Sequence, residues 1–149
     1  MDDWYFVTED QVTEFGGAVY LTKFSSLLRA LQSIYPNHRW EMWKFGTVSM
    51  GHWKKKENHI NFFDWLKRKM GFKSMDDWYN VTQEDIHRNG GGGLLLSYFR
   101  NSPSLALQSV YPQHPWMIWR FKQTSNRYWE NLDNQRSFLS WLHHKIAPE

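Results

Sequence analysis

The pentapeptide MDDWY opens the chain at residues 1–5 and recurs at residues 75–79. The similarity continues well beyond it, and the second copy gains two residues after its glycines. Further matches are Val7-Thr8 with Val81-Thr82, Gly16-Gly17 with Gly90-Gly91, Ala30-Leu31-Gln32-Ser33 with Ala106-Leu107-Gln108-Ser109, and Tyr35-Pro36 with Tyr111-Pro112. All ten tryptophans pair in register: Trp4, Trp40, Trp43, Trp53 and Trp65 match Trp78, Trp116, Trp119, Trp129 and Trp141. Because an internal repeat decides how a chain is organised, we divide the sequence into two tandem modules, residues 1–74 and 75–149.

Each module is small and rich in aromatic residues. A chain of 149 residues forms one domain or two small ones, and a module of roughly 75 residues lies near the size at which one core is only marginally stable. Aromatic residues make up 18% of the chain, and 10 of them are tryptophan. A buried tryptophan removes about 150–250 Å² from water. We therefore expect two small modules, each with a Trp-rich core.

Local patterns predict that each module is mostly α-helical. Thr8 and Gln11 have the spacing of a capping box, in which the threonine oxygen accepts an early helix N–H and the later side chain reaches back. Thr82 occupies the matching position, and the paired glycines that follow are typical of a helix end. The run Asn89–Gly93 also resembles a phosphate-binding loop, but the Lys-Ser/Thr that completes such a loop does not follow it.

The next two helices are predicted from breakers and caps. A second helix spans AVYLTKF in one copy and LLLSYF in the other. The third ends before Pro36 or Pro112, because the residue before proline is pushed out of the helical region. Ser102-Pro103 has the form of an N-cap followed by the first helical residue. The W-x-x-W-K/R-F segments that follow leave open an extended segment or a helical turn, and the loops after them are expected to close on a buried tryptophan.

The last helix of each copy has the clearest pattern. Residues 57–70 (ENHINFFDWLKRKM) and 134–146 (NQRSFLSWLHHKI) carry an amphipathic stripe, and Gly71 is the expected end of the first of them. The joint FKSM is too short to act as a flexible linker, so the modules are expected to pack closely. Trp4 and Tyr5 are expected to lie under their own module's helices or, in a later copy, against the last helix of the preceding one.

The second copy carries the motifs of a known repeat. In order, these are DWY-x-V-T, N-G-G-x-G-L-L, S-P-x-x-A-L-Q-S-V-Y-P, W-x-x-W-x-F, Y-W and F-L-x-W-L. The chain resembles, over almost its whole length, a tandem-repeat family of giant DNA viruses, arbuscular fungi and plants. The first copy departs from the pattern at its glycines, at Ser25-Ser26 where Ser-Pro is expected, and at His52 where Tyr precedes Trp. The resemblance implies no catalytic role and suggests an accessory module that binds nucleic acid or acts as a scaffold.

The polar residues shared by the copies do not converge on a catalytic pattern. His38 and His114 follow a Tyr-Pro turn beside tryptophan, which favours a structural histidine packed on an aromatic ring over a general base. His143-His144 lack the spacing and partners of a metal site. We expect a protein that is not an enzyme and that uses no cofactor and no metal.

The chain contains no cysteine, no apparent secretory leader and no apolar run of bilayer-spanning length. These features predict an intracellular protein without a membrane partner. If the chain is viral, as the resemblance suggests, the nucleus, the viral factory or the virion is the expected location.

Positive charge is concentrated in one part of the sequence. The formal net charge is +3 and the pI is near 9.1, but residues 1–42 carry −3, residues 43–73 carry +6, and the second copy is neutral. Local positive density attracts phosphate backbones, although the same residues could be the solvated faces of amphipathic helices. The candidate nucleic-acid-binding residues are Lys44, Lys54, Lys55, Lys56, Lys67, Arg68, Lys69, Lys73, Arg120, Lys122, Arg127 and Arg136.

The expected function is therefore non-catalytic binding of nucleic acid, DNA rather than RNA, through the phosphate backbone, mainly at Lys54–Lys56 and Lys67–Lys73. No base-reading motif is visible, so binding would be largely independent of sequence and sensitive to salt. The alternative is a protein-interaction or scaffold module, including self-association, because tandem repeats often build binding surfaces.

Overall fold

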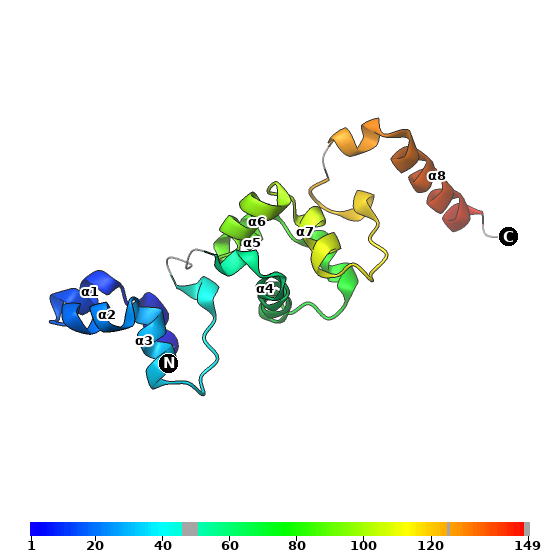
Figure 1. Ribbon diagram of the computed structural model, residues 1–149. Coiled ribbons are helices and arrows are strands. Elements are labelled where there is room, and N and C mark those ends of the chain that lie inside the picture. The colour runs from blue at the N-terminus through cyan, green and yellow to red at the C-terminus, as the bar shows by residue number, and fades with distance from the viewer. Residues whose placement is uncertain (46–50, 125, 148–149) are drawn as a thin grey trace. The chain divides into compact units, whose positions relative to one another are not determined.

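The computed structural model describes residues 1–45, 51–124 and 126–147. Within these ranges the chain is helical and forms no β-strand, which confirms the mostly α prediction (Figure 1). The α-helices are α1 (Glu9–Glu14), α2 (Ala18–Phe24), α3 (Leu27–Ile34), α4 (Lys56–Lys69), α5 (Gln83–Arg88), α6 (Gly92–Phe99), α7 (Pro103–Val110) and α8 (Leu132–Ile146). The 3₁₀-helices are η1 (Asp2–Phe6), η2 (Met42–Lys44), η3 (His52–Lys54), η4 (Met75–Asn80), η5 (Ile118–Arg120) and η6 (Asn126–Glu130).

Side-chain caps start the short helices where the sequence predicts them. The hydroxyls of Thr8 and Thr82 each accept the backbone N–H three residues on, of Gln11 and Asp85, at 3.2 Å. The side chains of Gln11 and Asp85 in turn accept the threonine N–H at 2.9 and 3.0 Å. Both predicted capping boxes are thus present. Helices of this length are not stable alone, so caps and packing together hold them.

Glycine ends the helices at the predicted positions. Gly16 follows α1 with φ at 95° and Gly90 follows α5 with φ at 91°, a conformation that strains other residues. Gly71 ends α4 with φ at 71°, and the Phe72 N–H returns to the Lys67 carbonyl at 3.0 Å. This bond is part of the Schellman pattern that closes helix ends. It confirms Gly71 as the end of the helix.

The W-x-x-W-K/R-F segments, for which the sequence left two possibilities, form the short 3₁₀ turns η2 and η5. The hydroxyls of Tyr5 and Tyr79 accept the backbone N–H of Glu41 and Met117, both at 2.9 Å. The Tyr5 ring also packs edge-on against Trp40 and the Tyr79 ring against Trp116, with centroids 5.8 and 5.6 Å apart. The two copies therefore share this aromatic cluster, and Tyr5 lies within its own copy as expected.

The expectation that the next loops close on a buried tryptophan is wrong for the second copy. Residues 46–50 and 125 of these segments lie outside the described residues. Trp53 is half-buried, whereas Trp129 is exposed. The reason is that α8, against which Trp129 packs, has no buried residue of its own.

The chain divides into two compact units, Met1–Asn58 and His59–Glu149. The division falls inside the first turn of α4 rather than at the repeat boundary after residue 74. Helix α4 therefore belongs to the first copy in sequence, while most of it belongs to the second unit in space. We call residues 1–58 unit 1 and residues 59–149 unit 2.

Helix α4 forms much of the core of unit 2. Phe62, Phe63 and Leu66 on its apolar stripe are completely buried. They account for the predicted amphipathic pattern. The same stripe on α8 contributes no buried residue.

Trp78 shows what covers the beginning of a copy. Its ring is completely buried and packs edge-on against Phe63 and Phe72, with centroids 5.7 and 5.0 Å away. Both partners come from the end of the first copy. Trp4, its equivalent, is only half-buried. The second of the two expected placements therefore holds for Trp78.

Candidate nucleic-acid interface

Three consecutive lysines mark the beginning of helix α4. Lys54 ends η3, Lys55 follows it, and Lys56 is the first residue of α4. All three side chains are exposed. A helix N-terminus carries partial positive charge from its unpaired N–H groups. The three lysines therefore add positive charge to the end of the helix that is already partly positive.

The second copy starts its equivalent helix in the usual way. The matching residues are Glu130, Asn131 and Leu132. Asn131 is the N-cap of α8, and its side chain accepts the Asp133 N–H at 2.8 Å. Asparagine is among the best N-cap residues, whereas lysine has no acceptor with which to cap. At position 55 the first copy thus has a positively charged side chain instead of one that can cap the helix.

The cluster at the other end of α4 is explained by the fold. Lys67, Arg68 and Lys69 lie in its last turn, where cations complement the helix dipole. Lys69 donates to the Asn89 side chain at 2.6 Å and lies over the Trp65 ring at 5.1 Å. Lys67 is half-buried and Lys73 is exposed. These residues form a second basic cluster in the sequence. One of them, Lys69, contacts other side chains of unit 2.

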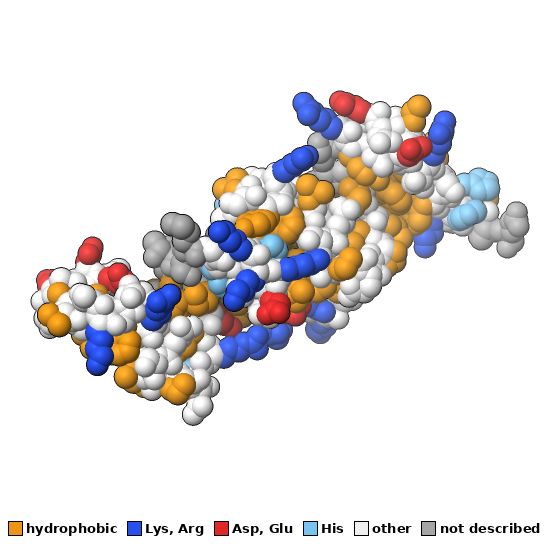
Figure 2. Space-filling view, in the orientation of Figure 1, with side chains coloured by type: hydrophobic (Ala, Val, Ile, Leu, Met, Phe, Trp, Pro, Cys, Tyr) orange, Lys and Arg blue, Asp and Glu red, His pale blue; other side chains and the backbone are white. Residues whose placement is uncertain are grey.

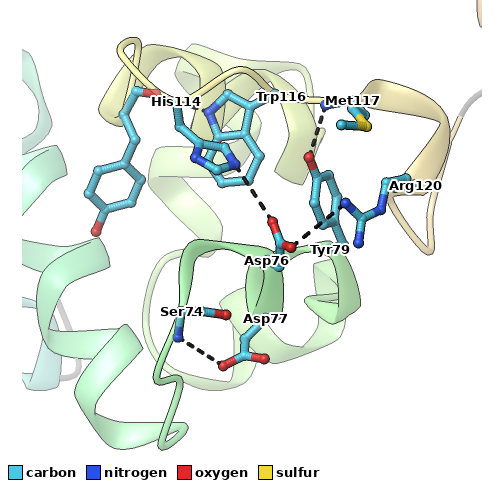
Figure 3. A network of polar contacts seen from close by, with 9 residues as sticks. Ser74, Asp76, Asp77, Tyr79, His114, Trp116, Met117 and Arg120 are labelled. Carbon is cyan, nitrogen blue, oxygen red and sulfur yellow. Dashed lines mark hydrogen bonds and ion pairs between the residues drawn. The ribbon is translucent and has the colours of Figure 1, made fainter. Parts of the chain in front are cut away.

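Lys44 and Arg120, at equivalent positions, have the same structural role in both copies. Arg120 lies over the Tyr79 ring, 4.4 Å from its centroid, and its guanidinium is 3.8 Å from an Asp76 carboxylate oxygen (Figure 3). Lys44 lies 5.3 Å over the Tyr5 ring and forms an ion pair with Glu41. Cation–π contacts of this kind tie the charge to the core. We therefore assign both residues to the aromatic cluster.

The remaining predicted residues lie on three different segments of the second copy. Lys122 is exposed, and its backbone N–H donates to the Tyr79 carbonyl at 2.8 Å. Arg127 lines a hollow of about 960 Å³ in unit 2. Arg136 is exposed and lies 3.5 Å from Asp133 in α8, a surface pair of small energetic value. Figure 2 shows lysine and arginine side chains at the surface of each unit.

The two histidines pack against tryptophan, as expected. The rings of His38 and Trp40 and of His114 and Trp116 meet edge-on, with centroids 4.3 Å apart in both copies. The His114 Nε2 is 3.9 Å from an Asp76 oxygen (Figure 3), which is too long for a hydrogen bond. The geometry is that of a structural histidine at the edge of the aromatic cluster.

Asp77, in the same close-up, ties the joint to the second copy. Its carboxylate accepts the backbone N–H groups of Lys73 and Ser74 at 2.8 and 3.2 Å. These hydrogen bonds favour the ionised form and lower the pKa of Asp77 below its ordinary value.

Asp77→Asn is expected to lower the melting temperature at neutral pH. A carboxyl whose pKa is lowered by folding stabilises the protein above its unfolded-state pKa, and this contribution is lost as pH falls through the folded-state value. The difference from the parent protein should therefore shrink below about pH 4 and vanish at lower pH. Thermal melts monitored by circular dichroism across this range measure it. A difference that stays constant with pH would contradict the assignment.

The glycine run of the second copy serves packing. A Cβ on Gly91 would lie 2.5 Å from Phe62 Cζ and 2.8 Å from Ile86 Cγ2. Glycine is thus required for close approach to α4. The run does not end in a separate loop, because Gly92 already begins α6. We attribute the run to helix contact.

Sequence reasoning did not identify an apolar groove in unit 1. The groove has a volume of about 610 Å³ and is lined mainly by apolar side chains from η1, α1, α2 and α3, including Trp4, Val12 and Tyr35. The comparison of the two copies contained a signal for it, since these residues match buried ones in the second copy.

Comparisons with protein-family models, with curated proteins and with solved structures found no match to this chain. Within the described ranges, no helix has both the length and the apolarity required to cross a bilayer. Over the same residues, no group of three or more His, Asp or Glu side chains is placed to hold a metal ion.

Proposed function

We propose that the protein binds nucleic acid, DNA rather than RNA, through its phosphate backbone and without catalysis, and that Lys54, Lys55 and Lys56 form the centre of the binding site. The observation that supports this proposal is the position of these lysines at the beginning of α4. Equivalent positions in the second copy hold an ordinary cap.

The arrangement costs stability in the absence of a ligand. A charge at a helix terminus is worth about 0.3–1 kcal/mol, and loss of an N-cap side chain costs about 1 kcal/mol. A phosphate at the same place reverses both effects, because the helix N–H groups and the lysines then share an anion. Glu57 in the same turn offsets part of the unfavourable charge, and a bound anion would offset more of it.

The mode of binding follows from the chemistry of lysine. Lysine contacts phosphate as a point charge and does not read bases in a fixed geometry. Binding should therefore depend weakly on sequence and strongly on salt, with dissociation constants of about 10⁻⁴–10⁻⁶ M at physiological salt. Lys67, Arg68 and Lys73 extend the positive charge along the same helix and its end.

A segment swap within the chain tests this proposal. Lys54→Glu, Lys55→Asn and Lys56→Leu together install the residues of the second copy. We expect affinity for a short DNA duplex to fall at least about tenfold at about 50 mM salt, and the slope of log K against log salt to become shallower by about 3. The melting temperature should rise, because the swap restores a cap. Fluorescence anisotropy and thermal melts provide the two readouts.

A matched control separates position from total charge. Lys23→Glu, Lys122→Asn and Arg136→Leu together change the net charge by the same amount at exposed positions elsewhere. This control should retain more affinity than the swap. Equal affinity of the parent and the swap, or no binding by the parent to duplex or single strand at about 50 mM salt, would exclude the proposal.

The apolar groove of unit 1 favours a second candidate function, a protein-interaction or scaffold module. Apolar grooves rimmed by polar residues are typical of binding surfaces for other chains. The groove involves different residues from the lysine site, so the two functions do not exclude each other.

A further inference from the structure

Helices α4 and α8 are the same helix in the two copies. Phe62, Phe63 and Leu66 of α4 correspond to Phe138, Leu139 and Leu142 of α8. The two helices have similar lengths, 14 and 15 residues, and both have an apolar stripe and a basic last turn. The residues that surround the two helices differ, and we use this difference to infer a binding partner for α8.

Helix α4 occupies a groove formed by η4, α5, α6 and α7 of unit 2. Phe63 packs on Trp78 at 5.7 Å, and Phe62 lies against Gly91, where no Cβ would fit. The Tyr111 hydroxyl donates to the Asp64 carboxylate at 2.7 Å. Burial and this hydrogen bond raise the pKa of Tyr111. The groove of the second copy is thus filled by a helix that precedes it in sequence.

The corresponding groove of unit 1 is open among the described residues. Its lining includes Trp4, Gly17 and Tyr35, which match Trp78, Gly91 and Tyr111. Tyr35 is 38% exposed, whereas Tyr111 is 9% exposed. The volume of about 610 Å³ is the space in which the second copy holds the side chains of α4.

The apolar face of α8 is only partly covered, because Phe138 packs against Trp119 and Trp129 while Leu139 beside it stays at the surface. Leu139 is 60% exposed, whereas its equivalent Phe63 is 0% exposed. A shallow hollow of about 310 Å³ lies on this face, lined by Trp129, Gln135, Phe138 and Leu139. Figure 2 shows hydrophobic side chains at the surface in the regions of both unit 1 and α8.

We propose that helix α8 of one molecule docks into the unit 1 groove of a second copy of this chain. The contacts that α4 makes in unit 2 indicate which residues of α8 would meet which residues of the unit 1 groove. Phe138 would meet Gly17, Leu139 would meet Trp4, and the Ser140 hydroxyl would replace Asp64 as the partner of a tyrosine hydroxyl, here Tyr35. The occupant is defined because the same chain already contains this interface once.

Charge supports the same partner. The first 42 residues carry a net charge of −3, and Glu14 is the last residue of α1, which lines the groove. The last turn of α8 contains His143, His144 and Lys145. In unit 2 the equivalent Lys69 reaches the end of α5, where it binds Asn89. A basic helix end therefore faces an acidic module.

The predicted interface is heterologous, because it joins two different surfaces. Each molecule offers one helix and one groove, so assembly proceeds head to tail into open chains or closed rings. The surfaces do not include Lys54, Lys55 or Lys56. The proposal does not depend on nucleic-acid binding.

Two single substitutions test the polarity of the interface. Leu139→Asp spoils the helix and leaves the groove intact, whereas Ile34→Asp spoils the groove and leaves the helix intact. Ile34 is exposed and matches buried Val110, so neither change alters a buried side chain of its own unit. Sedimentation velocity after nuclease treatment should show the parent growing beyond its monomer mass of 18.1 kDa as concentration rises from micromolar towards millimolar. Each variant alone should stay monomeric.

An equimolar mixture of the two variants is the decisive sample. It retains one intact helix and one intact groove, on different molecules, and should form a dimer of about twice the monomer mass. Leu96→Asp, at an exposed apolar position outside both surfaces, should assemble like the parent. A parent that stays monomeric, variants that still assemble, or a mixture that stays monomeric would each overturn the proposal.

Crosslinking provides a readout that tolerates weak association. The chain contains no cysteine, so Ser140→Cys and Tyr35→Cys each introduce a single thiol at an exposed position. A short bis-maleimide reagent should give a covalent dimer from the mixture of these two variants and far less from either alone. Equal yields from all three samples would overturn the head-to-tail arrangement.

Discussion

Replacement of Trp78 by alanine is expected to destabilise unit 2 by about 3–5 kcal/mol, the usual cost of deleting a large buried aromatic side chain. Trp78 is completely buried between Phe63 and Phe72. Trp4→Ala should cost only about 1 kcal/mol, because its ring lines an open groove. Hydrogen exchange followed by mass spectrometry on peptides from residues 59–124 reports unit 2 separately from unit 1.

Trp78→Phe is the control for ring packing. The indole N–H of Trp78 is buried with no hydrogen-bond partner among the described residues, so phenylalanine loses volume but no hydrogen bond. Its loss of protection should be clearly smaller than that of alanine. If Trp4→Ala and Trp78→Ala cost the same, the difference between the two grooves does not exist in solution.

The second large effect concerns where the chain can be divided. A fragment of residues 56–149 is expected to fold its α4–α7 core, whereas a fragment of residues 75–149 is expected to lack a fixed tertiary structure. The shorter fragment loses Phe62, Phe63 and Leu66, each worth roughly 1.5–3 kcal/mol when fully buried. Their sum, about 5–9 kcal/mol, is comparable with the total stability of a small domain.

Tryptophan emission and NMR dispersion distinguish the two fragments. In the longer one the average tryptophan emission should lie at shorter wavelength than in the shorter fragment, because Trp78 is buried, and the amide spectrum should be well dispersed. A synthetic peptide of residues 56–74 added to the shorter fragment should restore both signals, because it supplies α4. A shorter fragment that is well ordered without the peptide would show that the repeat boundary, not the start of α4, limits the folding unit.

The local structure could be predicted from the sequence because its causes are local. The Thr8 and Thr82 boxes, the Ser102-Pro103 start and the Gly71 end each depend on a few neighbouring residues. The tyrosine of each DDWY motif and the histidine after each Tyr-Pro turn also lie beside the expected tryptophans.

The placement of the last helices could not be predicted in this way. The apolar stripes of α4 and α8 are nearly the same, yet the α4 stripe is buried whereas the α8 stripe contributes no buried residue. A periodic stripe indicates that a helix has an apolar face but does not identify its partner. For the same reason the sequence placed Trp129 in a core when it is exposed.

The site that we propose is centred on fewer residues than the charge distribution suggested. The charge distribution also included Lys44, Lys69 and Arg120 among the candidates, and these residues contact aromatic rings or other side chains. The sequence does contain a signal that separates Lys54–Lys56 from the other basic residues. Lys55 stands at the position where the second copy has Asn131. This difference becomes informative only when position 55 is known to begin a helix.

The continuity of α4 has a thermodynamic consequence for any ligand of its first turn. The same fourteen-residue helix starts at the lysines and ends as a central part of the other unit. An anion that stabilises its beginning therefore also opposes its unravelling further along, by mass action on the folded state. Binding of an anion near residue 55 should therefore slow the hydrogen exchange of backbone amides around Leu66, although Leu66 does not contact the anion.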